Sequence, residues 1–142
     1  MKKVFLIHGA NLNMTGIRDK GIYGTQTLPE IVSDITAYSK DKGIEIKHFQ
    51  SNWEGRIVDV IHSAYKNADA IIINPGAFTH YSYAIRDAVA ASEVDAYEVH
   101  ISDIMNREDF RKISVIEPVC KAQFYGKGIK GYFEAIDMIA DD

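Results

Sequence analysis

The 142 residues of the chain correspond in size to one domain, and we expect a single domain over residues 1–142. The formal net charge is −4 with Lys and Arg scattered, which argues against a nucleic-acid partner, and no segment approaches the ~20 apolar residues of a membrane span. A single cysteine, Cys120, excludes an internal disulfide and fits a reducing cytoplasm, so we expect a cytoplasmic protein. The lack of a membrane span predicts no membrane partner.

Five short segments rich in Ile and Val, bounded by Gly, Asn, Asp or Pro, predict β-strands. They cover residues 4–7, 44–49, 70–73, 96–101 and 114–119. The third segment is apolar at consecutive positions, which is typical of a strand that is covered on both faces.

Helical patterns separate these segments. Thr27 and Glu30 have the spacing of a capping box, and Gly43 closes the helix that they begin. A second helix is predicted from an apolar stripe over residues 57–68 that includes Tyr65. Further helices are expected over residues 82–91, from residue 107 for a short stretch, and over residues 132–140.

Alternation of strands and helices predicts an α/β fold in which a parallel sheet has helices on both faces. Five strands suggest a flavodoxin-like three-layer sandwich with strand order 2-1-3-4-5. Ligands of such sheets bind outside the carboxyl ends of the strands, near the switch point between strands 1 and 3. The polar segments "GANLNMTGIRDKGIYG", "NPGAFTHYS" and "EVHISDIMNREDFR" follow strands 1, 3 and 4, so we expect a ligand site there.

The first of these segments, residues 9–24, is long enough to act as a lid over that site. Arg18 and Tyr23 lie five positions apart within it, and a guanidinium beside a phenol favours the phenolate. Arg18 could therefore activate Tyr23 as a base. Alternatively, Tyr23 packs the loop onto the body of the protein and Arg18 is solvated.

The second segment places Asn74 at the end of a buried strand and His80 just before a helix N-terminus, where both could bind a small molecule. A simpler interpretation makes Asn74 a turn former and His80 a neighbour of a helix cap. Arg86 and Asp87 lie inside the following helix, where they could form only a surface or subunit-contact pair.

The third segment contains "EVHIS", in which Glu98 and His100 lie two apart and so share one face of a strand. A carboxylate beside an imidazole fixes its tautomer and raises its pKa, which suits a general acid. The alternative is an ordinary strand end with polar residues outward. Arg107 and Arg111 follow, one helical turn apart; either could bind oxygens in the cleft, although for Arg107 we favour an ion pair on a solvated helix.

Several known site types are absent from the sequence. It contains no phosphate-binding P-loop, no G-x-G-x-x-G after the first strand, no G-x-S-x-G and no grouping spaced for a metal. The residues alone leave two classes open: an enzyme, or a flavodoxin-like module that binds a small anion without converting it. A flavin carrier is a further alternative, although the phosphate loop that it needs is not visible.

Five stretches, taken together and in order, closely resemble type II 3-dehydroquinate dehydratase over nearly the whole chain. They are "GANLNMTGIRDKGIYG", "QSNWEGRIVDVIHSA", "IIINPGAFTHYSYAIRDA", "YEVHISDIMNREDFR" and "GKGIKGYFEAI". The resemblance implies a hydro-lyase that reversibly removes water from 3-dehydroquinate to give 3-dehydroshikimate, by anti-elimination through an enolate. It also implies a place in the shikimate route to aromatic amino acids, with no metal, nucleotide or Schiff base.

The resemblance further implies catalytic roles. Tyr23 matches the base that removes the proton beside the ketone, and Arg18 matches the arginine that keeps it ionised. Asn11 matches the residue that stabilises the enolate. His100, steadied by Glu98, matches the acid that protonates the departing hydroxyl.

Binding roles follow by the same matching of positions. Asn74 and the backbone of Ile101 and Ser102 match the site for the substrate carboxylate, and His80 and Arg111 match contacts to ring hydroxyls.

The remaining expectations concern assembly and two departures from the family pattern. Asp87 matches an acidic residue that reaches a neighbouring subunit's site, so the resemblance implies trimers assembled into a homododecamer. Residues 9–11 read Gly-Ala-Asn where Gly-Pro-Asn is usual, and residues 18–21 lack a common proline, which puts the closure of the lid in doubt. After Ser102, residues 103–106 also depart from the usual Asn-x-His-Ala.

Overall fold

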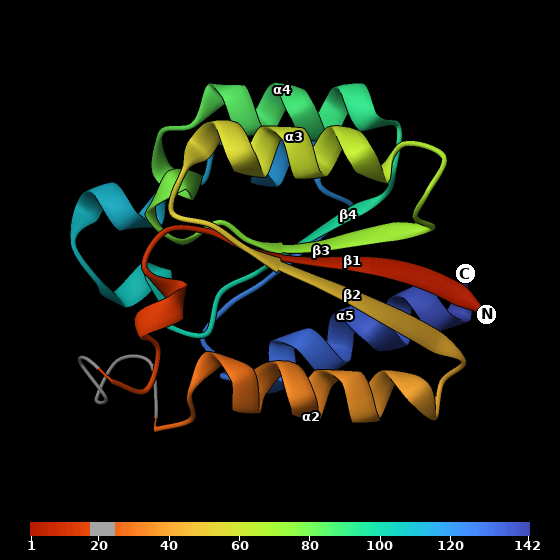
Figure 1. Ribbon diagram of the computed structural model, residues 1–142. Coiled ribbons are helices and arrows are strands. Elements are labelled where there is room, and N and C mark those ends of the chain that lie inside the picture. The colour runs from red at the N-terminus through yellow and green to blue at the C-terminus, as the bar shows by residue number, and fades with distance from the viewer. Residues whose placement is uncertain (18–24) are drawn as a thin grey trace.

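The computed structural model describes residues 1–17 and 25–142, and within them five strands form one parallel sheet (Figure 1). The order of the strands is β2-β1-β3-β4-β5, so the predicted order 2-1-3-4-5 is confirmed. Every neighbouring pair is parallel. The strands are β1 (Lys2–His8), β2 (Ile44–Gln50), β3 (Ala70–Asn74), β4 (Ala96–Val99) and β5 (Ala122–Phe124).

Two layers of helices enclose this sheet, α3 and α4 on one face and α2 and α5 on the other (Figure 1). Their bounds are α2 (Leu28–Lys40), α3 (Glu54–Ala64), α4 (Tyr83–Ser92) and α5 (Lys130–Asp141). The predicted three-layer, flavodoxin-like arrangement is therefore confirmed. In the part of the chain that the structure describes, no helix is long and apolar enough to span a membrane.

The helices start where local sequence signals predict. Thr27 caps α2 through a complete capping box with Glu30, and Ser82 caps α4 by accepting a hydrogen bond from the Ile85 amide (3.1 Å). Helix α3 was expected to extend to residue 68, but it ends at Ala64. Tyr65 instead lies at the end of the helix with 46% of its surface exposed, so its assignment to the buried stripe was wrong.

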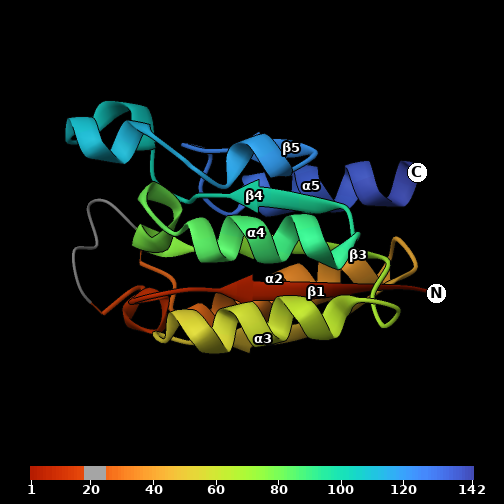
Figure 2. The same cartoon turned by 90° about the horizontal axis from the view of Figure 1, so that it is seen from above.

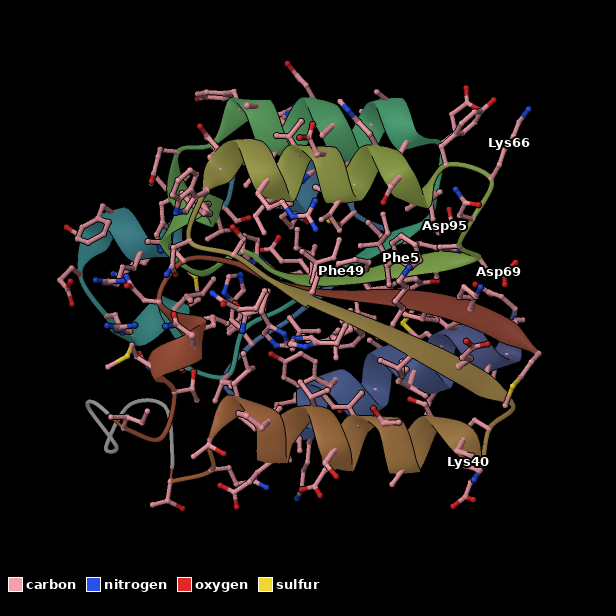
Figure 3. The ribbon with its side chains drawn as sticks, in the orientation of Figure 1. Phe5, Lys40, Phe49, Lys66, Asp69 and Asp95 are labelled. Atoms are coloured by element: carbon pink, nitrogen blue, oxygen red, sulfur yellow. The ribbon has the colours of Figure 1, made fainter. Side chains whose placement is uncertain are left out.

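Two apolar cores lie on the two faces of the sheet, because successive strand residues point to opposite faces. Phe5 and Ile7 of β1 pack toward α3 and α4, and Val4 and Leu6 pack toward α2 and α5. Phe5 also contacts Phe49 of β2, with ring centroids 5.0 Å apart, and Figure 3 shows this pair on the sheet. By the same alternation His8 points to the α5 side, which matters for the site described below.

The last strand differs from the prediction. Residues 114–119, expected as strand 5, form a loop and the 3-10 helix η5 (Glu117–Val119), in which Val115 and Ile116 are buried in the core beside α4. Pro118 lies in this segment, and proline cannot donate a sheet hydrogen bond. The edge of the sheet is formed instead by β5, whose Gln123 pairs with Glu98 of β4.

Strand β4 is also two residues shorter than expected, because it ends at Val99. The His100 amide still donates to the Phe124 carbonyl (2.9 Å), so the chain leaves the sheet at this residue.

Short 3-10 helices gather at the carboxyl ends of the strands, at the left in Figures 1 and 2. They are η1 (Leu12–Met14), η2 (Gly76–His80), η3 (Ile104–Asn106) and η4 (Asp109–Lys112). The short helix expected from residue 107 is η4, which starts two residues later. These segments build the walls of the site.

Candidate active site

A cavity of about 100 Å³ opens at the carboxyl ends of β1, β3 and β4, at the predicted switch point. Its walls come from the segments that follow those three strands. They include seven of the residues proposed from the sequence: Asn11, Asn74, His80, His100, Ile101, Ser102 and Arg111.

Two glycines let the backbones after β1 and β3 meet beneath this cavity. A Cβ on Gly9 would lie 2.1 Å from the Pro75 carbonyl oxygen, and one on Gly76 would lie 2.6 Å from the Ala10 carbonyl oxygen. Gly76 also has φ +63°, a conformation that side chains rarely adopt. The close approach brings Asn11 and Asn74 into one pocket.

Glu98 and His100 lie in contact, as the strand spacing predicts. His100 Nε2 is hydrogen-bonded to Glu98 Oε2, and both residues are buried, with 5% and 0% of their surfaces exposed. Because the carboxylate engages Nε2, it fixes the tautomer and orientation of the ring. His100 lines the cavity while Glu98 lies behind it.

Two hydroxyl groups support the buried carboxylate. Thr79 Oγ1 donates to Glu98 Oε2 (2.7 Å), and Ser114 Oγ is 2.9 Å from each carboxylate oxygen. Burial alone raises the pKa of Glu98, but the hydrogen bonds from His100, Thr79 and Ser114 hold that pKa below its ordinary value. Glu98 is therefore a carboxylate, and the ring beside it has a fixed negative partner.

His80 faces the same cavity in a defined tautomer. Its Nδ1 donates to the Ile113 carbonyl oxygen (2.8 Å), which leaves Nε2 as an acceptor. Burial lowers the pKa of His80, so the ring is neutral near pH 7. A neutral imidazole held in this way can accept a hydrogen bond from a hydroxyl group through Nε2.

Asn74, at the end of β3, forms the turn that the sequence suggested and also lies in the cavity wall. Its Oδ1 accepts from the Gly76 amide (3.2 Å), which forms the turn, and the side chain also lines the cavity. Its Nδ2 donates to the Tyr132 hydroxyl (3.1 Å), which is buried under the sheet on α5.

Asn11 precedes η1 with a left-handed backbone, φ 69° and ψ −1°. Its amide donates to Asn52 Oδ1 (2.8 Å), and Gln50 Nε2 is 3.3 Å from that same oxygen. Asparagine adopts this conformation more readily than most residues with a side chain, and the hydrogen bond to Asn52, in the loop after β2, fixes the backbone of Asn11 in the cavity wall.

The chain after β4 contributes cations and backbone donors. Arg111 lines the cavity and its Nε donates to Glu108 Oε2 (2.8 Å). Arg107, expected in an ion pair on a solvated helix, lies in extended backbone before η4 and also lines the cavity. The carbonyl oxygens of Ile101 and Ser102 accept from the amides of Gly128 and Gly126 after β5, which fixes the backbone of both residues in the cavity wall.

The remaining residues proposed from the sequence are Glu98, which lies behind His100, and Arg18, Tyr23 and Asp87. Arg18 and Tyr23 lie outside the described residues. Asp87 lies on the exposed face of α4 and does not line the chain's own cavity. Within residues 1–17 and 25–142, no group of three or more His, Cys, Asp or Glu side chains could hold a metal ion.

Sequence reasoning missed the residues that support the site from behind. Thr79 and Ser114 had no motif to mark them, although a buried carboxylate always requires such donors. Tyr132 appeared only within a predicted helix, and His8 lay just beyond the predicted strand of residues 4–7, yet Tyr132 bonds to Asn74 and His8 bonds to Tyr132. The polar position of His8 within an apolar strand was the available signal.

Comparisons with known proteins agree with this geometry. A family model described as "Dehydroquinase class II" matches residues 2–140. A 3-dehydroquinate dehydratase of Lachnoclostridium phytofermentans is 54% identical over 138 residues, which cover 96% of this chain and 95% of the relative.

Two crystal structures of type II dehydroquinases are similar over nearly the whole fold. The enzyme from Butyrivibrio crossotus has a TM-score of 0.94 at 54% identity and covers 97% of each chain. The enzyme from Propionibacterium acnes has a TM-score of 0.96 at 34% identity, covering 100% of this chain and 98% of that one. The fold, the position of the cavity and these matches lead to one conclusion: the chain belongs to the class II dehydroquinase family.

Proposed function

We propose that the residues around this cavity carry out the family's reaction as a base, an enolate stabiliser and a general acid. Membership of the family makes the chain a hydro-lyase that acts on 3-dehydroquinate, in the shikimate route to aromatic amino acids. The observation that best supports the assignment of roles is the buried Glu98–His100 pair at the cavity.

The reaction needs three groups in different places. A base takes a proton from the carbon beside the ketone, and the electron pair forms an enolate whose oxygen needs a hydrogen-bond donor. The enolate then re-forms the ketone as the bond from carbon to the leaving hydroxyl breaks. An acid supplies a proton to that oxygen, so water leaves and a conjugated enone remains.

His100 is the acid in this proposal. Because Glu98 engages Nε2, His100 delivers the proton from Nδ1, and the fixed carboxylate stabilises the charged ring before transfer. Thr79 and Ser114 keep Glu98 ionised throughout, so the proton moves between His100 and the substrate.

Tyr23 is the base and Arg18 the residue that ionises it. This assignment depends on the family motif, because both residues lie outside the described part of the chain. A phenol with a pKa near ~10 is a poor base at neutral pH, and an adjacent guanidinium stabilises its anion.

Asn11 stabilises the enolate, and the other residues of the cavity bind the ground state. Asn74 and the N–H groups of Ile101 and Ser102 hold the substrate carboxylate. His80 accepts a hydrogen bond from a ring hydroxyl through Nε2, and Arg111 donates to another.

The test compares His100→Gln with His62→Gln, because His62 is an exposed histidine of α3 outside the cavity. Formation of the enone is followed by its ultraviolet absorbance. Loss of the acid lowers kcat by about 10²- to 10⁴-fold, whereas His62→Gln retains wild-type kcat. Equal rates for the two variants would contradict the role of His100.

Assembly into trimers, and of trimers into a homododecamer, is part of the same proposal. Asp87 is exposed on α4 near two exposed tyrosines, Tyr81 (58%) and Tyr83 (62%), so this face is available to a neighbouring subunit. Sedimentation of the intact protein measures the number of copies. In mixtures of Asp87→Ala and His100→Gln proteins, recovered activity would support a site that is shared between subunits, and no recovery would contradict it.

A further inference from the structure

A line of hydrogen bonds runs from Asn74 of β3 along the α5 face of the sheet to β2 at its edge. Asn74 Nδ2 lies 3.1 Å from the Tyr132 hydroxyl, which lies 2.8 Å from His8 Nε2. His8 Nδ1 in turn lies 3.0 Å from His48 Nε2 on β2. His8 and Tyr132 are completely buried and Asn74 is 4% exposed, so water cannot replace these bonds.

The direction of each bond in this line is determined by its chemistry. Asn74 Oδ1 accepts from the Gly76 amide, so Nδ2 is the atom that faces Tyr132 and donates to its oxygen. The Tyr132 proton then has His8 Nε2 as its acceptor, which places the ring proton of His8 on Nδ1, toward His48.

The same assignment of donors and acceptors excludes the opposite tautomer of His8. With its proton on Nε2, His8 would donate to Tyr132, whose oxygen already accepts from Asn74. The buried hydroxyl proton would then have no acceptor, since Asn74 and His8 are its two partners in the described part of the chain. Burial, with a smaller contribution from His48, lowers the pKa of His8 to about 3, so the ring is neutral as the line requires.

We propose that His8 and Tyr132 are positioning residues for substrate binding, because they hold the Asn74 amide so that its second Nδ2–H faces the cavity. The inference rests on the proposed role of Asn74 at the substrate carboxylate. A carboxylate accepts hydrogen bonds and donates none, so an amide that rotated to present Oδ1 would repel it. The hydrogen bonds of Asn74 Oδ1 with the Gly76 N–H and of Asn74 Nδ2 with the Tyr132 hydroxyl hold both polar ends of the side chain and prevent that rotation.

The first experiment compares Tyr132→Phe with Tyr97→Phe. Both tyrosines are buried in the same core, but the Tyr97 hydroxyl donates to Asp142 (3.2 Å), whereas the Tyr132 hydroxyl bonds to Asn74 and His8. We expect Tyr132→Phe to raise KM by about tenfold with kcat within about threefold, because the lost contact acts on bound substrate and transition state alike. Tyr97→Phe retains the wild-type KM.

The second experiment substitutes His8. In His8→Leu the Tyr132 proton loses its acceptor and KM rises, whereas the Oε1 of Gln in His8→Gln can accept that proton and restores KM toward the wild-type value. A purely structural role would give both variants the same KM and change only thermal stability. These variants also carry the test if Tyr132→Phe fails to fold.

A double-mutant cycle separates this inference from the proposed function. In an Asn74→Ala background, Tyr132→Phe should leave KM unchanged, because the group that it positions is missing. If Asn74→Ala raises KM but Tyr132→Phe alone does not, the inference is overturned and the proposed function stands. If Asn74→Ala itself leaves KM unchanged, the binding role of Asn74 is overturned and the inference falls with it.

Discussion

The proposed role of His100 depends on Glu98, which is a negative charge with no exposed surface. An ionised carboxylate in such a position is tolerated only when its oxygens are hydrogen-bonded. Here His100, Thr79 and Ser114 supply those bonds. In the proposed mechanism, the negative charge of Glu98, rather than the shape of its side chain, is what favours proton donation by His100.

Glu98→Gln tests this directly. The amide fills the same space but loses the charge, so the charged form of His100 is destabilised and kcat should fall by about 100-fold or more. The fold should persist, since Thr79 and Ser114 still have an oxygen to which they can donate. The matched control is Glu45→Gln on the exposed edge of β2, for which we expect wild-type kcat. A Glu98→Gln rate within tenfold of wild type would contradict the role of the charge.

The sequence predicted the residues of the cavity more completely than it predicted their support. Glu98 and His100 were accessible because a period of two along a strand places them together. Thr79 and Ser114 were not, because their contact with Glu98 depends on how η2 and the loop before η5 pack against β4. Such contacts between distant segments leave no pattern in a single sequence.

At the scale of elements, the alternation of apolar segments predicted the sheet well and failed at its last strand. The segment "SVIEPV" is apolar because Val115 and Ile116 fill the core beside α4, and burial alone does not distinguish a strand from a buried loop. The true strand, β5, is three half-buried residues with the sequence "AQF", too short and too polar for the pattern. Pro118 was the one local sign against the prediction.

The close approach of the loops after β1 and β3 brings residues from two elements into one cavity. We expect Gly76→Ala to lower both stability and kcat/KM. The alanine would have to adopt the positive φ of this position, which a residue with a Cβ disfavours, and its Cβ would lie 2.6 Å from the Ala10 carbonyl oxygen. Gly43→Ala separates the two effects. Gly43 has φ +73°, and no atom lies within 4 Å of the point that a Cβ would occupy, so alanine there should cost only about 1 kcal/mol and leave kcat/KM unchanged.

Chemical denaturation and steady-state kinetics of both glycine variants give the two quantities needed. If Gly76→Ala matched Gly43→Ala in stability and kcat/KM, the close contact between the backbones of Gly76 and Ala10 would not be needed for activity. A loss of kcat/KM confined to Gly76→Ala would support the contact as the feature that brings Asn11 and Asn74 together.

At the scale of the whole molecule, the two ends of the sheet have different chemistry. The carboxyl ends of the strands carry the cavity with its histidines, asparagines and arginines. The opposite end carries carboxylates and lysines such as Asp69, Asp95 and Lys66, which Figure 3 shows together at the right. The interior of the protein is apolar except for a few polar residues, and His8 is among those that have no exposed surface.

His8 links that interior to the pH dependence of stability. Its pKa is lowered from 6.5 to about 3 in the folded protein, chiefly by burial. Between these two values the unfolded chain binds a proton that the folded chain does not. The contribution of His8 is therefore fully present above about pH 6.5, and it is lost as the pH falls toward 3, by up to ~1.4 kcal/mol per pH unit.

We expect His8→Gln to flatten this dependence, because glutamine does not titrate. Denaturation curves of wild type and variant between pH 4 and 7, at one protein concentration, give the slope of the free energy of unfolding against pH for each. The wild-type slope should be steeper by up to ~1.4 kcal/mol per pH unit, which corresponds to one proton, whatever the absolute stabilities of the two proteins. His48 and His80, whose pKa values burial also lowers, remain in both proteins and contribute to both slopes. Parallel curves for wild type and His8→Gln would mean that His8 takes up its proton in the folded state as it does in the unfolded chain.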